Sequence, residues 1–183
     1  MSETGNLPPQ DLRRVALWNN KMFGFSENSN ILRFTEDWYY ELWPVFNQIP
    51  IGNSDPIRAI IPRGSNLVIF KDAQTYEFWG SSKFNYNYKL ISSMHGTNRP
   101  ETVQAIDENR IVFVDRDNKV WLYDGSFTEI SLPINIEGNY FRSAIMGRYY
   151  LLWAVNVWGR QGYNPNLLRS ADGNLPMPLG GGD

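Results

Sequence analysis

Short runs of apolar residues, separated by polar turn residues, follow one another from Leu12 to about Val157. Aromatic and β-branched residues are common in these runs, and such residues favour the pleated, half-buried surface of a sheet. The stretch from Asp37 to Phe46 comes nearest to a helical spacing, but Pro44 and the clustered aromatic residues favour a strand or a loop there. The pattern therefore predicts an all-β fold.

An internal repeat organises these runs. Each of four segments contains an apolar strand, two polar turn residues and a second apolar strand. The segments are VALW-NN-KMFGF (Val15–Phe25), AIIPRG-SN-LVIF (Ala59–Phe70), VQAID-EN-RIVFV (Val103–Val114) and SAIM-GR-YYLLW (Ser143–Trp153). The spacing between second strands is 45 residues from Phe25 to Phe70, 44 from Phe70 to Val114 and 38 from Ile111 to Tyr149. Equivalent places in four successive sheets are therefore predicted for Met22–Phe25, Leu67–Phe70, Ile111–Val114 and Tyr149–Trp153.

The first three copies continue into two further strands. Turns rich in Ser, Asn and Asp lead to a third strand at Ile31–Glu36, Thr75–Gly80 and Lys119–Gly125. A fourth strand is expected at Tyr39–Trp43, Tyr88–Ser92 and Phe127–Leu132. Four antiparallel strands in a unit of about 40–45 residues are typical of a β-propeller blade.

The fourth copy shows no such continuation after Val155, because the chain from Trp158 onward is rich in Gly, Pro and Asn. The sequence thus predicts β-propeller-like repeats at residues 13–157, with about three four-stranded blades plus a partial fourth. A flexible lead-in at 1–12 and an extended C-terminal arm or tail at 158–183 are expected on either side. Closed propellers typically have about 4–8 blades, and an uncovered sheet edge promotes aggregation. We therefore expect other subunits to cover the edges or to complete a homo-oligomeric ring.

Composition and charge exclude several classes of protein. Lys and Arg number 17 against 19 Asp and Glu, and this formal net charge of −2 is unlike that of a protein that grips nucleic-acid phosphates. The absence of cysteine and the presence of one histidine exclude disulfides, cysteine nucleophiles, thiolate metal sites and a histidine-rich metal site within one chain. No apolar run approaches the roughly 18–20 residues that cross a bilayer, and no secretory signal is predicted.

Two polar groups are candidates for chemistry, and both fit structural roles better. His95 lies in SSMHGT near Ser92 and Glu101, but the G-x-S-x-G motif of a serine nucleophile is absent. Asp115 and Asp117 are of the type that performs glycoside hydrolysis or binds Ca²⁺, but they fall where a hairpin turn is expected. The sequence therefore predicts no catalytic residues, no metal site and no cofactor.

The aromatic residues are the better candidates for a binding role. They make up 15% of the chain, and most lie within predicted strands, where they are expected to pack in the core. A denser group lies in a less regular stretch. Because aromatic residues are enriched at interface hot spots, that group and two aromatic residues of the arm are the predicted protein–protein contacts. The candidates are Trp38, Tyr39, Tyr40, Trp43, Trp158 and Tyr163.

Two blades also resemble those of a known family. Ile57–Gly80 (IRAIIPRGSNLVIFKDAQTYEFWG) and Ile111–Gly125 (IVFVDRDNKVWLYDG), preceded by WNNKMFGFSENSN, are similar to blades of the propeller-type tail proteins of tailed phages. The corresponding family motifs are ALVPxRGxLxVFKxxxIYxLxG and xVFLSRDGVYxYDG. The group includes the tail nozzle (tail tubular protein B) and the DNA-stabilising tail proteins of short-tailed phages. The resemblance covers roughly residues 13–155, in a chain shorter than is usual for these proteins.

The resemblance implies a virion protein that is not an enzyme. Its partners would be other phage tail or connector proteins, and DNA would pass through its lumen without sequence-specific binding. The predicted function is therefore that of a structural protein of a phage tail or head-to-tail connector. The alternative is a carbohydrate-binding or carbohydrate-active β-propeller, and a general protein-interaction scaffold is a third hypothesis. A hydrolase would place carboxylates at blade ends around one channel, whereas the acidic residues here fall mainly in predicted hairpin turns.

Overall fold

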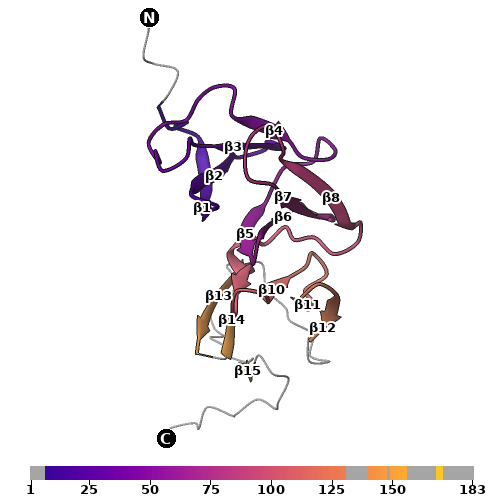
Figure 1. The fold of residues 1–183 in the computed structure, drawn as a ribbon. Helices are drawn as coiled ribbons and strands as arrows, with labels where there is room; N and C mark the ends of the chain where they lie inside the picture. The colour runs from indigo at the N-terminus through magenta and orange to yellow at the C-terminus, as the bar shows by residue number, and fades with distance from the viewer. Residues whose placement is uncertain (1–6, 131–139, 148, 156–167, 171–183) are drawn as a thin grey trace, which may run out of the picture. The chain divides into compact units, whose positions relative to one another are not determined.

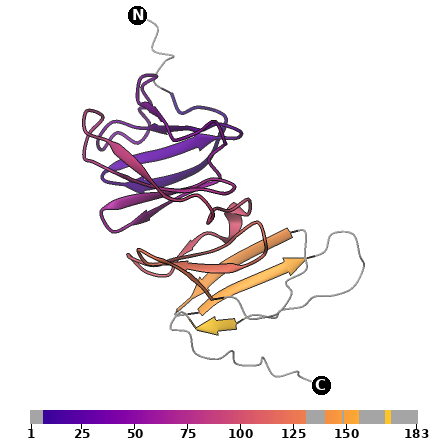
Figure 2. The ribbon, with the colours of Figure 1, turned by 90° about the vertical axis from the view of Figure 1, so that its right-hand side faces the viewer.

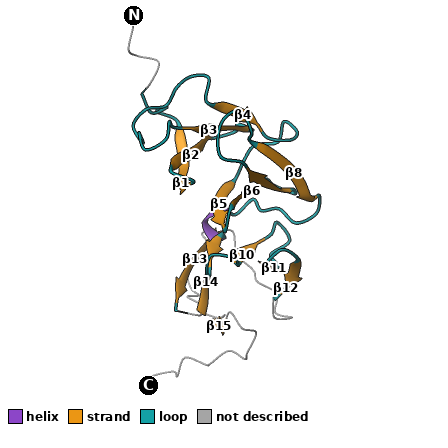
Figure 3. Cartoon of the chain, in the orientation of Figure 1, coloured by secondary structure: helices purple, strands orange, loops and turns teal. Residues whose placement is uncertain are grey.

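The computed structural model describes residues 7–130, 140–147, 149–155 and 168–170. In these residues the strands form four antiparallel sheets, and the only helical element is one turn of 3-10 helix, η2 (Pro100–Thr102) (Figure 3). The chain divides into two compact units, the first ending at Asn98 and the second beginning at Arg99. The predicted all-β fold is confirmed. Each unit is described by itself below.

The first unit contains two four-stranded sheets whose strands are consecutive in the sequence (Figure 1). The first sheet consists of β1 (Leu12–Trp18), β2 (Lys21–Ser26), β3 (Ile31–Phe34) and β4 (Gln48–Pro50). The second sheet consists of β5 (Ala59–Arg63), β6 (Asn66–Phe70), β7 (Thr75–Trp79) and β8 (Asn87–Ser92). This arrangement of neighbouring strands is that of a propeller blade.

Backbone conformation explains the tight turns of this unit. Asn19 and Asn20 connect β1 to β2 with φ of 47° and 60°, as a two-residue type I′ hairpin requires. The turn between β5 and β6 lies at Gly64 and Ser65, one residue earlier than predicted, because Arg63 pairs with Asn66. Gly64 has a φ of 53°, which glycine adopts without steric cost.

The core of the first unit lies between the facing sides of its two sheets. Alternate residues of β2 and β3 point into it, and aromatic rings dominate the packing. Phe23 lies 5.5 Å from Phe34 and 5.8 Å from Phe78, measured between ring centroids. Since fully burying an aromatic or aliphatic side chain contributes about 1.5–3 kcal/mol, this cluster is the main source of stability in the unit. Its buried members are Trp18, Phe23, Phe25, Leu32, Phe34, Ile51, Ile57, Ile60, Leu67, Ile69, Tyr76 and Phe78.

The second unit contains a four-stranded and a three-stranded sheet. The four-stranded sheet consists of β9 (Gln104–Ala105), β10 (Ile111–Val114), β11 (Val120–Tyr123) and β12 (Phe127–Glu129). The three-stranded sheet consists of β13 (Tyr140–Met146), β14 (Tyr149–Val155) and β15 (Leu168–Ser170), and Figure 2 shows its two long strands in orange. Side chains from both sheets of the second unit pack into one hydrophobic cluster. Its buried members are Val112, Val114, Val120, Phe141, Tyr150 and Leu152.

The predicted repeat is confirmed. Each of the four segments singled out by the spacing lies in the second strand of its sheet, in β2, β6, β10 and β14. The protein therefore has a β-propeller-like fold with three four-stranded sheets and a partial fourth.

Two strand predictions were wrong. Tyr39–Trp43 is a turn-rich loop, and the fourth strand of the first sheet is β4, because Trp38 has a φ of 65° that breaks the extended backbone. The fourth sheet gains a third strand that was not expected, since Leu168 pairs with Leu151 of β14. An edge strand needs only backbone pairing, so the Gly- and Pro-rich composition around it concealed β15. Apart from β15, the predicted arm at residues 158–183 lies outside the described residues.

Candidate functional site

The connection between β3 and β4, here called the aromatic loop, comprises residues 35–47 and presents several large apolar side chains to solvent. Trp38 is 68% exposed and Tyr39 is 60% exposed. Tyr40, Val45 and Phe46 are exposed as well. Exposed apolar side chains that gather in one loop mark an interaction site more often than singly scattered ones do.

Backbone hydrogen bonds fix the shape of the aromatic loop. The amide of Glu36 donates to the carbonyl of Leu42 at 3.2 Å, and the amide of Leu42 donates to the carbonyl of Tyr39 at 3.0 Å. The amide of Trp38 donates to the carbonyl of Asn20 at 3.0 Å, which ties the loop to the β1–β2 turn. These bonds hold Trp38 at its positive φ, a conformation that is unusual for a bulky residue. The indole of Trp38 is thus held out in solvent by the fold.

Trp43 has a different role from its aromatic neighbours. It is 5% exposed, and its Nε1 donates to the carbonyl of Tyr40 at 3.1 Å. It also lines a pocket of about 240 Å³ beside the loop. Trp43 therefore anchors the loop, and the exposed part of the predicted contact group is Trp38, Tyr39 and Tyr40. The pocket is lined by Leu7, Pro9, Arg33, Trp43, Pro44, Val45 and Gln48.

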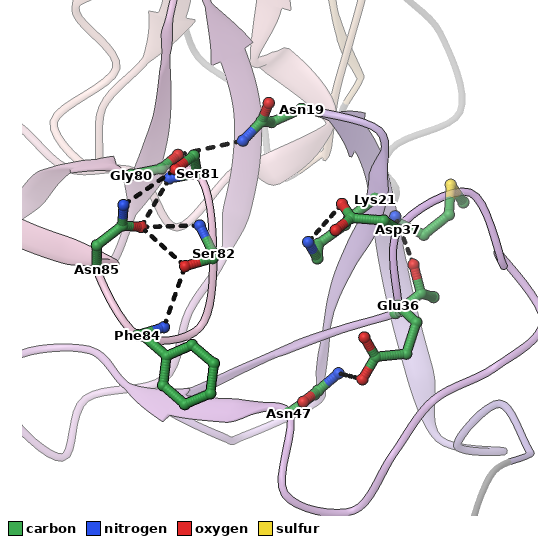
Figure 4. A network of polar contacts seen from close by, with 12 residues as sticks. Asn19, Lys21, Glu36, Asp37, Asn47, Gly80, Ser81, Ser82, Phe84 and Asn85 are labelled. Carbon is green, nitrogen blue, oxygen red and sulfur yellow. Dashed lines mark hydrogen bonds and ion pairs between the residues drawn. The ribbon is translucent and has the colours of Figure 1, made fainter.

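Two charged contacts fix the base of the loop (Figure 4). The buried Lys21 ammonium donates to Asp37 Oδ1 at 2.5 Å, and Asn47 Nδ2 donates to Glu36 Oε1 at 2.9 Å. Lys21 has a side chain that is 4% exposed, whereas that of Asp37 is 58% exposed. A buried cation is thus neutralised by a carboxylate that still faces solvent. The neighbouring Tyr86 hydroxyl is buried, and burial together with the charges of Asp37 and Glu36 raises its pKa.

The remaining predicted contacts, Trp158 and Tyr163, lie outside the described residues.

The His95 and Ser92 pair closes the turn that follows β8. The Ser92 hydroxyl oxygen accepts the amides of Met94 and His95 at 3.1 and 3.0 Å, and it lies 2.8 Å from His95 Nδ1. The Thr75 hydroxyl in turn donates to the carbonyl of His95. The Ser92 hydroxyl thus stabilises the turn by accepting two of its backbone amides. His95 lies in that turn, as predicted for a histidine of a polar loop.

Asp115 is likewise a turn residue. Its Oδ1 accepts the amides of Asp117 and Lys119 at 2.8 and 2.9 Å, and its Oδ2 accepts Trp121 Nε1 at 2.8 Å. Both oxygens of this buried carboxylate are therefore used in the turn between β10 and β11, which confirms the hairpin-turn interpretation. Among the described residues, no three His, Cys, Asp or Glu side chains lie close enough together to hold a metal ion.

Two buried charges, one directly after β6 and one within β7, were not anticipated from the sequence. The fully buried Lys71 donates from Nζ to the carbonyls of Ile51 and Asn53, each at 2.6 Å. Burial lowers the pKa of Lys71, against a smaller effect of Asp55. Only the positions of those carbonyls in space reveal this site, because nothing in the run LVIFKD distinguishes a buried lysine from an exposed one.

The second buried charge is Glu77. It lies 3.5 Å from Arg63 and 3.1 Å from Lys89, and its side chain is 9% exposed. Burial would raise its pKa, but hydrogen bonds from Asn66 and Lys89 and the charge of Arg63 together hold it below the ordinary value. Lys71 and Glu77 thus stabilise the sheet by satisfying buried polar groups.

In the part of the chain that the structure describes, no helix is long and apolar enough to span a membrane.

Comparison with known proteins supports the fold. No family model matches the chain, and no curated protein matches it. The N-terminal domain of Nup159 is similar in structure at 12% identity, with a TM-score of 0.52 over 81% of this chain and 40% of that one. A chain of a S. cerevisiae complex of Dbp5 with Nup159 and Gle1 is similar at 12% identity, with a TM-score of 0.51 over 83% and 41%. The C-terminal WD40 domain of Sif2 matches at 12% identity, with a TM-score of 0.47 over 78% and 40%.

The chain thus spans about 40% of the length of the first two structures, and at 12% identity their likeness establishes the β-propeller-like fold alone.

Proposed function

We propose that this chain is a non-enzymatic structural protein of a phage tail or head-to-tail connector, repeated in a homo-oligomeric ring around the passage for DNA. The observation that carries the proposal is the placement of the two phage-like motifs. Ile57–Gly80 spans β5 to β7, and Ile111–Gly125 spans β10 and β11. Both motifs include the second and third strands of their sheets, so the two resemblances fall on the same part of a blade, which supports the proposal.

The polar residues of the first motif serve the blade. Gly64 supplies the left-handed turn between β5 and β6. Lys71 satisfies buried carbonyls, and Arg63 lies against the buried Glu77. A motif whose polar groups are engaged within the sheet suits a protein that must hold its shape. This supports a building block over an enzyme.

The second motif leads to the same conclusion. Asp115 is the residue that a carbohydrate hydrolase would need as an acid or base, and both of its oxygens accept hydrogen bonds within its own hairpin. A partner-binding role is left to the surface loops, of which the aromatic loop has the strongest features. Contacts with other tail or connector proteins are therefore expected there.

One observation favours the carbohydrate alternative. Trp38, Tyr39 and Tyr40 are exposed next to the carboxylates of Glu36 and Asp37, and sugars stack on aromatic faces while their hydroxyls bond to carboxylates. A glycan-binding propeller would use the same loop. The two hypotheses differ in whether soluble glycans bind the isolated chain.

Locating the chain tests the proposal. Mass spectrometry of purified virions, with antibody labelling in electron micrographs, is expected to find many copies in the tail or connector. Portal and tail genes are expected beside its gene. Absence from the particles would contradict the proposal. Glycan hydrolysis that is lost in both Asp115→Asn and Asp117→Asn would support the carbohydrate alternative.

A further inference from the structure

The aromatic loop lies in the most one-sided stretch of charge in the first unit. Between Arg33 and Arg58 the chain has four acidic residues and no Lys, Arg or His. Three of the four, Glu36, Asp37 and Glu41, lie in the aromatic loop itself. The charged side chains of the loop itself are therefore all carboxylates, of which Asp37 is paired with Lys21, while Arg33 lines the pocket beside the loop.

The loop is also preorganised. Trp38 keeps a backbone conformation that is unfavourable for a bulky residue, and strain of this kind is concentrated at functional sites. The buried Lys21 fixes Asp37, and Asn47 fixes Glu36. Rings and carboxylates that are already in place lose little conformational entropy when a partner binds.

We propose that the aromatic loop binds an arginine-bearing segment of a partner protein. A guanidinium stacks on Trp and Tyr faces and forms forked hydrogen bonds with carboxylates, and the loop presents the exposed Trp38 and the exposed Glu41 three residues apart. Lysine matches the charge but not the planar stacking surface or the fork. The chemistry of the loop thus selects arginine over lysine. This inference deepens the proposed function, since it names the partner chemistry of the surface that function uses.

The β7–β8 connection provides a contrast within the same unit. Phe84 is 89% exposed, and the ammonium of its neighbour Lys83 lies 5.5 Å from its ring centroid. The ring of Phe84 therefore has a cation of its own chain over it. An exposed ring in basic surroundings should not attract an arginine segment, which makes Phe84 the matched control for Trp38.

The test uses the full chain and three fluorescein-labelled heptapeptides in which glycine alternates with arginine, lysine or glutamine. Fluorescence anisotropy measures the dissociation constants at two salt concentrations. The arginine peptide is expected to bind about fivefold or more tightly than the lysine peptide, because only arginine adds stacking and forked hydrogen bonds. The glutamine peptide is expected not to bind. Raising the salt should weaken binding without abolishing the preference for arginine.

Variants locate the site. Trp38→Ala should weaken arginine-peptide binding about tenfold, which is the usual loss for an interface hot spot, and Glu41→Gln should weaken it about threefold. Phe84→Ala should bind as the unaltered chain does. Thermal unfolding of each variant shows whether the first unit is still folded, and Trp38 and Glu41 are exposed residues whose replacement spares the core.

Equal binding of the arginine and lysine peptides, no measurable binding of either, or an equal loss in Trp38→Ala and Phe84→Ala would overturn the inference. Binding of a soluble glycan that depends on Trp38 would assign the loop to sugars instead. Detection of the chain in virions is a separate result, so the proposed function can hold while this inference fails.

Discussion

The connection from the third to the fourth strand differs widely among the three four-stranded sheets. It covers residues 35–47 in the first sheet, 80–86 in the second and 124–126 in the third. In the third sheet the Asp124 carboxylate closes the turn by accepting the amide of Ser126 at 3.2 Å. In the first sheet the same connection is a long loop with exposed Trp38 and Phe46. The sheets repeat while this connection varies, which is how loops on a constant scaffold acquire function.

The two longer connections are held in different ways. In the β7–β8 connection Asn85 Oδ1 accepts the amides of Ser81 and Ser82 at 2.9 and 2.8 Å, so one of the loop's own side chains caps it, and Asn19 also donates to the carbonyl of Gly80 at 3.2 Å (Figure 4). The aromatic loop is instead held by residues that reach the body of the sheet, Lys21 and the buried Trp43. Its conformation should therefore depend on the stability of the first sheet.

The largest test of this difference is the removal of the buried anchor. Trp43→Ala should lower the free energy of unfolding of the first unit by about 4 kcal/mol. Removal of the buried indole leaves a cavity and takes away the hydrogen bond to the carbonyl of Tyr40. Asp124→Ala, which opens only the short third-sheet turn, should cost about 1 kcal/mol. Urea unfolding followed by circular dichroism measures both. Equal costs would show that the aromatic loop is no better anchored than a simple turn.

The second test concerns the strands that flank the β7–β8 connection. Glu77→Gln should cost about 3 kcal/mol at neutral pH, because it leaves Arg63 and Lys89 without their carboxylate. Since the folded pKa of Glu77 lies below the ordinary 4.5, its contribution is complete above that pH and is lost as the pH falls through the folded value. Thermal unfolding from pH 7 to pH 3 should therefore show a smaller acid dependence in the variant. An unchanged acid dependence in the variant would contradict the lowered pKa of Glu77 in the folded protein.

Neutralising the carboxylate at the base of the aromatic loop should have an intermediate effect. Asp37→Asn leaves the buried Lys21 ammonium without its anion, at a cost of about 2 kcal/mol, which is reduced from that of a fully buried pair because Asp37 is half exposed. Asp117→Asn, at an exposed turn position, should change stability by less than about 0.5 kcal/mol. The melting temperatures of the two variants provide the comparison, and similar shifts would contradict it.

The smallest effect measures backbone strain. Trp38→Gly and Trp38→Ala both remove the indole, but only glycine adopts a φ of 65° without steric strain. The glycine variant should therefore be more stable than the alanine variant by about 1 kcal/mol. At Ala16 of β1, where the backbone is extended, Ala16→Gly should be destabilising instead. If alanine at position 38 were as stable as glycine, the loop would store no strain at Trp38.

Periodicity carried most of the information about the fold. Short apolar runs bounded by polar turn residues located the second strand of every sheet, because that strand is largely buried in β2, β6 and β10 and alternates between buried and half-buried residues in the described part of β14. Tyr39–Trp43 misled the prediction, since aromatic residues favour strands locally and only tertiary contacts reveal the positive φ of Trp38. The exposed aromatic group was found, but the burial of Trp43 and the role of Lys21 depend on neighbours distant in the sequence.

The order of the sheets along the chain has a kinetic consequence. Each four-stranded sheet is built from strands that are consecutive in the sequence, so most strand pairings close loops of only a few residues. Such short loops lose little entropy on closing, and proteins rich in local contacts fold quickly for their size. Each hairpin can therefore form as it leaves the ribosome, before the next sheet has been synthesised. Strands β4 and β15 are the exceptions. Strand β4 pairs with β3 across residues 35–47, and β15 pairs with β14 across residues 156–167, so these two strands are expected to join their sheets last.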